Sequence, residues 1–177
     1  MVHQEIIIAG FGGQGILSAG RVLAYAGMLE NKNVSWLPSY GPEMRGGTAN
    51  CSVIISDELV GSPILNNATS LIVMNGPSLD KFEAMVVKGG MIISDSSLID
   101  RKSSRTDIDV YEIPATKLAS DMGNQTFANI FLLGKLIAKT GIVSKENFEA
   151  ALRKVLPKKH HHLIPEEMKA LEDGMNY

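Results

Sequence analysis

The sequence predicts an α/β fold, a three-layer α/β/α sandwich around a mixed, mostly parallel sheet, with residues 1–177 forming a single domain. Three observations support this prediction. Short β-branched apolar segments alternate with helical patterns, the last third of the chain reads as helices, and a glycine-rich turn directly follows the first apolar segment. The composition, 45% apolar and 20% charged, is ordinary for a globular protein that buries a core without disulfides.

The first predicted strand, residues 4–9, ends in three isoleucines and an alanine, a pattern typical of a strand buried on both faces. The glycine-rich turn then leads into a predicted helix at 16–31, whose small residues suit close packing on a sheet. A second strand is predicted at 34–37. Positions 38–47 are rich in Gly and Pro, which predicts a loop.

The middle of the chain predicts further strands and one helix. Asp57 and Glu58 indicate a hairpin turn, and Pro77 suits the first turn of a helix. The predicted strands here are 48–56, 59–62 (returning from the hairpin), 71–74, 91–95 and 107–113, and the predicted helix is 78–87, ended by 88–90.

The remaining residues predict helices. Segment 125–140 has an apolar face and is followed by Gly141, a common residue just past a helix end. Ser144 is a suitable N-cap for the helix after it, which Pro157 ends. The predicted helices are 115–121, 125–140, 145–156 and 165–174.

Charge and cysteine content exclude several classes of function. With 17 basic and 19 acidic residues, the net charge of −2 gives no reason to expect binding to nucleic acid or to a membrane. The single cysteine, Cys51, cannot hold an iron–sulfur cluster, a structural zinc or an internal disulfide, and we expect it in the core. The first residues lack a cationic, signal-like region, and the longest apolar segment, 127–138, is interrupted by Lys135. We therefore expect a cytoplasmic protein.

The first candidate site is the loop Gly10-Phe11-Gly12-Gly13-Gln14-Gly15, which matches G-x-G-x-x-G between a strand and a helix. Such glycines let a phosphate approach the backbone at a helix N-terminus. An NAD site also needs an acidic residue after the second strand, and none occurs before Glu43. No lysine follows Gly15, which excludes a P-loop. Three interpretations stay open: a tight turn packed against another subunit or cofactor edge, a site for a cofactor's phosphate, and, disfavoured by the missing acid, an NAD site.

The second candidate site is the segment 39–47, rich in Gly and Pro. We expect it at the carboxyl edge of the sheet, beside the glycine loop. Arg45 could pair with a phosphate, a carboxylate or a partner's acid, and Tyr40 could cover an aromatic ring; an ordinary surface turn is the alternative. The candidate residues here are Tyr40, Gly41, Glu43, Arg45, Gly46 and Gly47.

Two other features favour structural interpretations. Asp95 ends a predicted strand, where an aspartate commonly caps the following turn. The run His160–His162 carries metal-binding chemistry, but adjacent histidines on a helix point in different directions, so we expect a polar surface. We assign no catalytic residue and no metal site.

Together the two loops resemble a known family. Residues 6–20 followed by Tyr40-Gly41-Pro42-Glu43-Met44-Arg45-Gly46-Gly47 are similar to the gamma subunit of 2-oxoacid:ferredoxin oxidoreductases, and the resemblance extends over nearly the whole chain. The continuation Thr48-Ala49-Asn50-Cys51 is most similar to the 2-oxoglutarate branch. Pyruvate and branched-chain 2-oxoacid enzymes have related subunits. The resemblance implies the fold of domain III of pyruvate–ferredoxin oxidoreductase.

The resemblance also implies a function within a complex. Such enzymes decarboxylate a 2-oxoacid oxidatively on thiamine diphosphate and Mg, form an acyl-coenzyme A, and pass electrons through iron–sulfur clusters to ferredoxin. The implied partners are alpha, beta and ferredoxin-like delta subunits, and this chain would bind none of these cofactors alone and would be inactive alone. Two alternatives remain: a scaffold subunit that touches no ligand, and, less favoured, a free-standing nucleotide-binding oxidoreductase.

Overall fold

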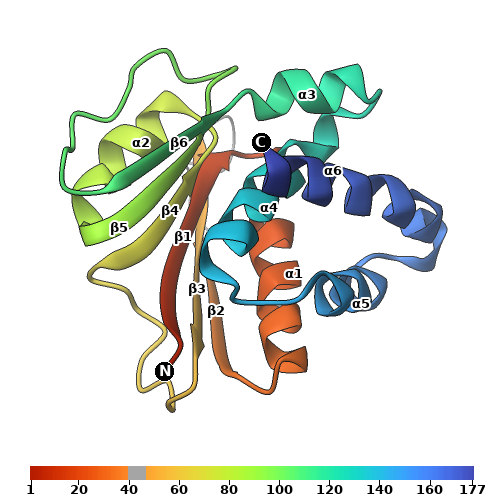
Figure 1. Ribbon diagram of the computed structural model, residues 1–177, viewed down its shortest axis with the longest axis horizontal. Helices are drawn as coiled ribbons and strands as arrows, with labels where there is room; N and C mark the ends of the chain where they lie inside the picture. The colour runs from red at the N-terminus through yellow and green to blue at the C-terminus, as the bar shows by residue number, and fades with distance from the viewer. Residues whose placement is uncertain (40–46) are drawn as a thin grey trace.

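The computed structural model describes residues 1–39 and 47–177, and its centre is one six-stranded sheet (Figure 1). The strands lie in the order β2-β3-β1-β4-β5-β6. Their bounds are β1 His3–Phe11, β2 Asn33–Ser39, β3 Thr48–Ser56, β4 Ala68–Val73, β5 Val86–Asp95 and β6 Asp109–Ile113.

The sheet is mixed, as predicted. Strand β1 pairs in parallel with β4, β4 with β5, and β5 with β6, whereas β3 is antiparallel to both β1 and β2. Because β3 runs opposite to both of its neighbours, β1 and β2 run in the same direction. The carboxyl ends of β1 and β2, at Phe11 and Ser39, therefore lie at the same edge of the sheet.

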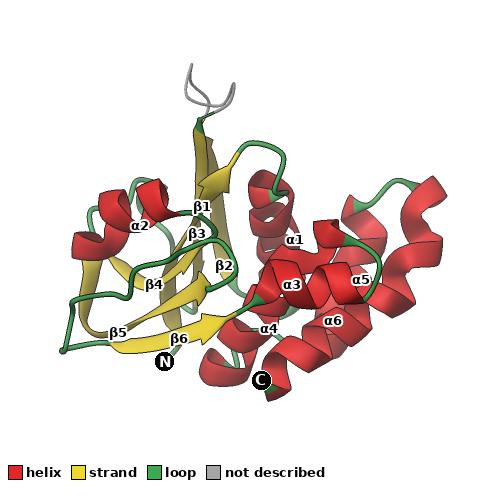
Figure 2. Ribbon diagram, turned by 90° about the horizontal axis from the view of Figure 1, so that it is seen from above, coloured by secondary structure: helices red, strands yellow, loops and turns green. Residues whose placement is uncertain are grey.

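Helices cover the two faces of the sheet unequally, and Figure 2 shows α2 alone on one side. The α/β/α sandwich is confirmed, with one thin outer layer and one thick one. The helices are α1 Ile16–Leu29, α2 Gly76–Phe82, α3 Ala115–Asp121, α4 Ala128–Thr140, α5 Lys145–Val155 and α6 Ile164–Asn176. Short 3₁₀ helices, η2 Glu83–Met85, η3 Gln125–Phe127 and η4 Lys158–Leu163, adjoin them in the described part of the chain.

The alternation of side chains along β1 separates two hydrophobic cores. Ile6 and Ile8 belong to the large core under α1 and α4, whereas Ile7 and Ala9 belong to the smaller core that includes Leu79 of α2. All four β1 residues are almost fully buried, so this strand is central, as its β-branched run predicts.

Helices α4 and α6 pack with their backbones in close approach. A Cβ added to Gly134 would lie 2.2 Å from the carbonyl oxygen of Leu171, and one added to Gly174 would lie 2.1 Å from that of Phe131. Only glycine fits at these two positions. This contact fixes α6 against α4 and thereby sets where the first turn of α6 lies.

Several predicted helix ends are confirmed. Ser144 accepts a hydrogen bond from the backbone N–H of Asn147 over 3.1 Å and caps α5, and Gly141 ends α4 with a φ of 62°. Within the described part of the chain, none of the helices has both the length and the apolar character needed to span a bilayer.

Two predicted elements are wrong. Residues 59–62 form no strand, because β3 already has β1 and β2 on its two sides and offers no free edge to a returning strand. The helix predicted for 78–87 ends at Phe82, and η2 completes it. Val86 pairs with Ala68 of β4, so Val86, Val87 and residues 88–90 belong to β5 and not to a helix end.

Candidate functional site

The glycine loop connects β1 to α1 in a conformation that needs glycine. Gly10 and Phe11 still pair with β3, so the turn starts at Gly12. Gly13 has a φ of 91°, and Gly15, the N-cap of α1, has a φ of 72°. Both values lie in the left-handed region that disfavours side chains. A Cβ on Gly15 would also lie 2.6 Å from the side-chain nitrogen of Asn129.

Gln14 fastens this loop to the ends of two parallel strands. Its side-chain Oε1 accepts a hydrogen bond from the N–H of Phe11 over 2.6 Å, and its Nε2 donates to the carbonyl of Met74 over 3.3 Å. The N–H of Met74 in turn donates to the carbonyl of Ala9. Gln14 therefore stabilises the loop through both the oxygen and the nitrogen of its side-chain amide.

Asn129 of α4 holds the loop from the helical side. Its Nδ2 donates to the carbonyl of Gln14 over 2.9 Å and lies 3.5 Å from the carbonyl of Gly15. The side chain is buried among the apolar residues of α4. Sequence analysis missed Asn129; its only signal is a polar residue on an otherwise apolar helix.

The second predicted loop meets the first at its described end. The N–H of Gly12 donates to the carbonyl of Gly47 over 3.2 Å, which confirms that this end of the second loop lies beside the glycine loop. The other predicted site residues of this loop, Tyr40, Gly41, Glu43, Arg45 and Gly46, lie outside the described residues.

Large apolar side chains are exposed at the edge of the sheet beside the glycine loop. Phe11 is 42% exposed and Leu37 is 39% exposed, although both are large apolar side chains at strand ends. Beside Phe11, a hollow of about 320 Å³ lies over Gly12, Gly13 and the first turn of α1. That turn has no side-chain cap and no acidic residue, so its N–H groups leave a positive end. This edge can accept an apolar partner surface or an anion.

A dinucleotide site is not supported by the sheet. Strand β2 carries no acidic residue from Asn33 to Ser39, and β3 separates β2 from β1. In a dinucleotide-binding fold, the acidic residue that contacts the ribose comes from a strand next to the first. The sheet therefore lacks both features of a dinucleotide site: β2 has no acidic residue for the ribose, and it does not lie next to β1.

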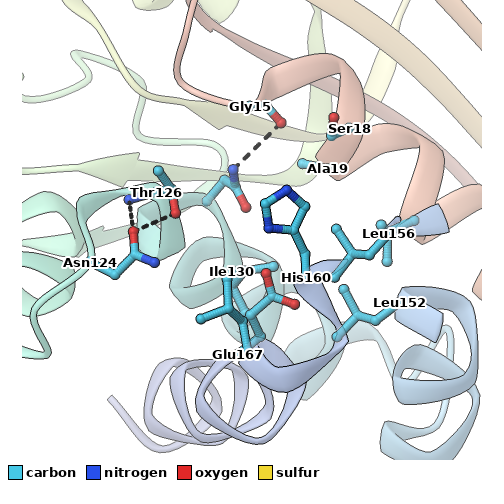
Figure 3. Close-up of a pocket in the computed structure, with 13 residues that line it drawn as sticks. Gly15, Ser18, Ala19, Asn124, Thr126, Ile130, Leu152, Leu156, His160 and Glu167 are labelled. Atoms are coloured by element: carbon cyan, nitrogen blue, oxygen red, sulfur yellow. Dashed lines mark hydrogen bonds between the residues drawn. The ribbon is translucent and has the colours of Figure 1, made fainter. Parts of the chain in front are cut away.

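A larger pocket, of about 380 Å³, lies behind the glycine loop between α1, α4, α5 and the start of α6 (Figure 3). Sequence analysis missed this pocket. Glu167 is 9% exposed and its Oε2 is buried without a hydrogen-bond partner among the described residues. Burial raises the pKa of Glu167 to about 7. Its signal in the sequence is a carboxylate on the apolar face of a helix, between Ile164 and Leu171.

The remaining candidates are structural, with one exception. Cys51 is fully buried, and burial raises the pKa of its thiol to about 12, so it is inert in the folded protein. Asp95 caps the next turn, as predicted, through the N–H of Ser97, and also accepts from the hydroxyl of Thr116 over 2.6 Å. In the histidine run, His160 is exposed but lines the pocket behind the glycine loop, His161 is half-buried and its Nε2 donates to the carbonyl of Leu156 over 2.9 Å, and His162 is exposed polar surface.

The chain is similar to proteins of known type over nearly its full length. The family model described as pyruvate ferredoxin/flavodoxin oxidoreductase matches residues 5–177. The ketoisovalerate oxidoreductase subunit VorA of Methanothermobacter marburgensis is 40% identical over 98% of this chain, but the match covers 36% of that protein. The chain thus spans about a third of the length of that relative.

Two further relatives match over most of both chains. The 2-oxoglutarate synthase subunit KorC of Methanocaldococcus jannaschii is 38% identical over 89% of this chain and 86% of its own. The crystal structure of a keto/oxoacid ferredoxin oxidoreductase gamma subunit from Geobacter sulfurreducens superimposes with a TM-score of 0.82 at 31% identity, covering 98% of this chain and 96% of the other.

Proposed function

Because the chain belongs to the pyruvate ferredoxin/flavodoxin oxidoreductase family, we propose that it is the gamma subunit of a 2-oxoacid:ferredoxin oxidoreductase. One observation carries the proposal: two proteins named as separate subunits of such enzymes, KorC and the Geobacter gamma subunit, each align with this chain over more than four-fifths of their own length. The chain has the fold of such a subunit.

In this proposal the cofactors of the enzyme are held mainly by other subunits. The single cysteine is buried in the core, and the described residues bring no three His, Cys, Asp or Glu side chains together. These residues therefore do not fit an iron–sulfur cluster or the Mg of thiamine diphosphate. We assign those groups to alpha, beta and ferredoxin-like delta partner subunits, which pass electrons to ferredoxin.

The open edge at the glycine loop supports a contact with these partners. Phe11 and Leu37 expose apolar surface near the carboxyl ends of β1 and β2. This surface lies next to the glycine loop, where Gly12 donates a hydrogen bond to Gly47. A partner subunit bound at this edge would bury this apolar surface and remove it from water. The uncapped first turn of α1 supports a second candidate role at the same edge, contact with a phosphate of coenzyme A.

We propose 2-oxoglutarate as the substrate of the complex. The relatives divide between ketoisovalerate and 2-oxoglutarate enzymes, at 40% and 38% identity. The match to KorC covers 86% of that protein, and segment 43–51 is most similar to the 2-oxoglutarate branch.

The test is purification of the chain with an affinity tag from its native host. We expect thiamine-binding and ferredoxin-like subunits to co-purify, and the complex to reduce ferredoxin with 2-oxoglutarate at least about tenfold more efficiently, in kcat/KM, than with ketoisovalerate or pyruvate. A preference for either of the other acids would refute the substrate. Purification of the chain alone, from cells that contain the enzyme activity, would refute the subunit role.

A further inference from the structure

The large pocket behind the glycine loop has the composition of a ligand site. Its volume of about 380 Å³ lies within the range of small-molecule pockets. Polar groups of Ser18, Asn124, Thr126 and Asn129 form part of its lining. Apart from His160 and Glu167, the rest of the lining is apolar and includes Ala19, Val22, Ile130, Leu152, Leu156 and Leu163.

Glu167 is the unexplained group in this pocket. Its carboxyl is held on the apolar side of α6, beside Ile130 (Figure 3), and its buried Oε2 has no partner in the described part of the chain. An ionised carboxylate accepts hydrogen bonds and donates none, so it is satisfied only by a donor, and best by a cation. No Lys or Arg is among the residues that line the pocket.

We propose that this pocket binds a small aliphatic amine, with the ammonium group on the Glu167 carboxylate and the apolar body against Val22, Leu152 and Leu156. The ammonium supplies both the missing donor and the missing charge, and the apolar walls take up the alkyl chain. This ligand site extends from the glycine loop toward α5 and α6, and it shares only Gly15 and Ser18 with the hollow at the edge proposed for the partner contact.

A second ionisable side chain faces the carboxylate. Figure 3 shows His160 of η4 reaching into the same space, and no salt bridge joins it to Glu167 in the described residues. The pocket-lining residues of α1, α4 and α5 are not ionisable. Burial raises the pKa of Glu167 to about 7, so the carboxylate is mostly ionised at pH 8 and mostly protonated at pH 6.

The test is a titration of the full chain followed by ¹H–¹⁵N NMR at pH 8, using hexan-1-amine and, as a neutral probe of equal length, hexan-1-ol. We expect saturable shifts at Ser18, Asn129 and Leu152, and a Kd for the amine at least about tenfold below that for the alcohol. Equal Kd values for the amine and the alcohol would overturn the proposal, as would amine-induced chemical-shift changes spread over the acidic residues of the surface.

Two neighbouring substitutions separate the buried carboxylate from general charge effects. Glu167→Gln should raise the amine Kd to that of the alcohol and leave alcohol binding unchanged. Glu166→Gln removes an exposed carboxylate from the same turn and should change neither. An amine Kd unaffected by Glu167→Gln, or raised equally by Glu166→Gln, would refute the assignment.

The pH dependence of amine binding to the unsubstituted chain tests the role of Glu167 even if the Glu167→Gln variant does not fold. Between pH 8 and pH 6 the amine Kd should rise about tenfold, and it should still rise in His160→Asn. A pH dependence that disappears in His160→Asn would assign the effect to the histidine and would overturn the role of Glu167.

Discussion

The side-chain amide of Asn129 donates a hydrogen bond to the backbone carbonyl of Gln14 over 2.9 Å, joining α4 to the glycine loop across 115 positions of sequence. Gln14 itself binds the ends of β1 and β4. The loop is therefore fixed from the sheet and from the helical layer at once, and its shape is built into the fold before any partner binds.

Asn129→Ala should destabilise the chain because it leaves the buried carbonyl of Gln14 without its donor. The expected loss is about 1–2 kcal/mol in the free energy of unfolding, measured by urea denaturation. Asn176→Ala, at an exposed position near the end of α6, is the control and should change stability by less than about 0.5 kcal/mol. Equal effects of the two substitutions would mean that the hydrogen bond contributes nothing.

Phe11→Asp should impair assembly of the complex and leave the isolated chain folded. Phe11 is 42% exposed at the edge assigned to the partners, so a charge there would be buried by a partner at high cost. We expect affinity for the partner subunits to fall by more than about tenfold in a pull-down titration. Leu59→Asp places the same charge at a position that is 89% exposed and away from this edge, and it should assemble normally. Normal assembly of the Phe11 variant would remove this edge from the interface.

Glu167 should make stability fall as pH rises through neutrality. Its pKa is raised from 4.5 to about 7 in the folded protein, so the native state binds more protons than the unfolded state between these values, and stability falls across that window. Glu167→Gln should remove this fall, and at pH 8 the variant should be more stable than the natural chain by on the order of 2–3 kcal/mol. At pH 4 the two should be alike. A variant that is less stable at pH 8 would contradict this account of the buried carboxyl.

Cys51 should resist thiol reagents as long as the chain is folded. The side chain is fully buried, its Sγ lies 3.5 Å from the carbonyl of Ile16, and burial raises its pKa to about 12. Reaction with a disulfide reagent should therefore follow unfolding, and its rate should rise with urea concentration together with the unfolded fraction. Rapid, stoichiometric labelling in buffer alone would show that α1 opens easily from β3.

Much of the fold could be predicted because local pattern and tertiary environment agree. The β-branched run of β1 predicts a central strand, and the side chain of Ser144 and the position of Gly141 predict helix ends that the structure contains. The prediction of a returning strand at 59–62 was wrong for a reason that is not local: whether β3 has a free edge depends on β2, a separate strand that pairs along it from Asn33 to Ser39. Strand pairing of this kind leaves no mark in the segment itself.

The candidate site was predictable only in part for the same reason. Glycine spacing predicts the loop, and the hydrogen bond between Gly12 and Gly47 confirms that the described end of the second motif lies beside the glycine loop. Asn129 and Glu167 act through contacts with residues far away in sequence, and each is marked only as a polar residue on an apolar helix face. A buried polar side chain whose partner is unknown cannot be assigned a role until the fold supplies its surroundings.

The most direct test of the central claim is to assemble the oxidoreductase complex from purified subunits with and without this chain, and to measure ferredoxin reduction in the presence of thiamine diphosphate, coenzyme A and 2-oxoglutarate. If this chain is a gamma subunit that encloses part of the catalytic assembly, we expect the complex without it to reduce ferredoxin at less than about a tenth of the full rate. Adding the chain back should restore the rate in proportion to the amount bound. Full activity of the complex assembled without this chain would contradict the proposed function.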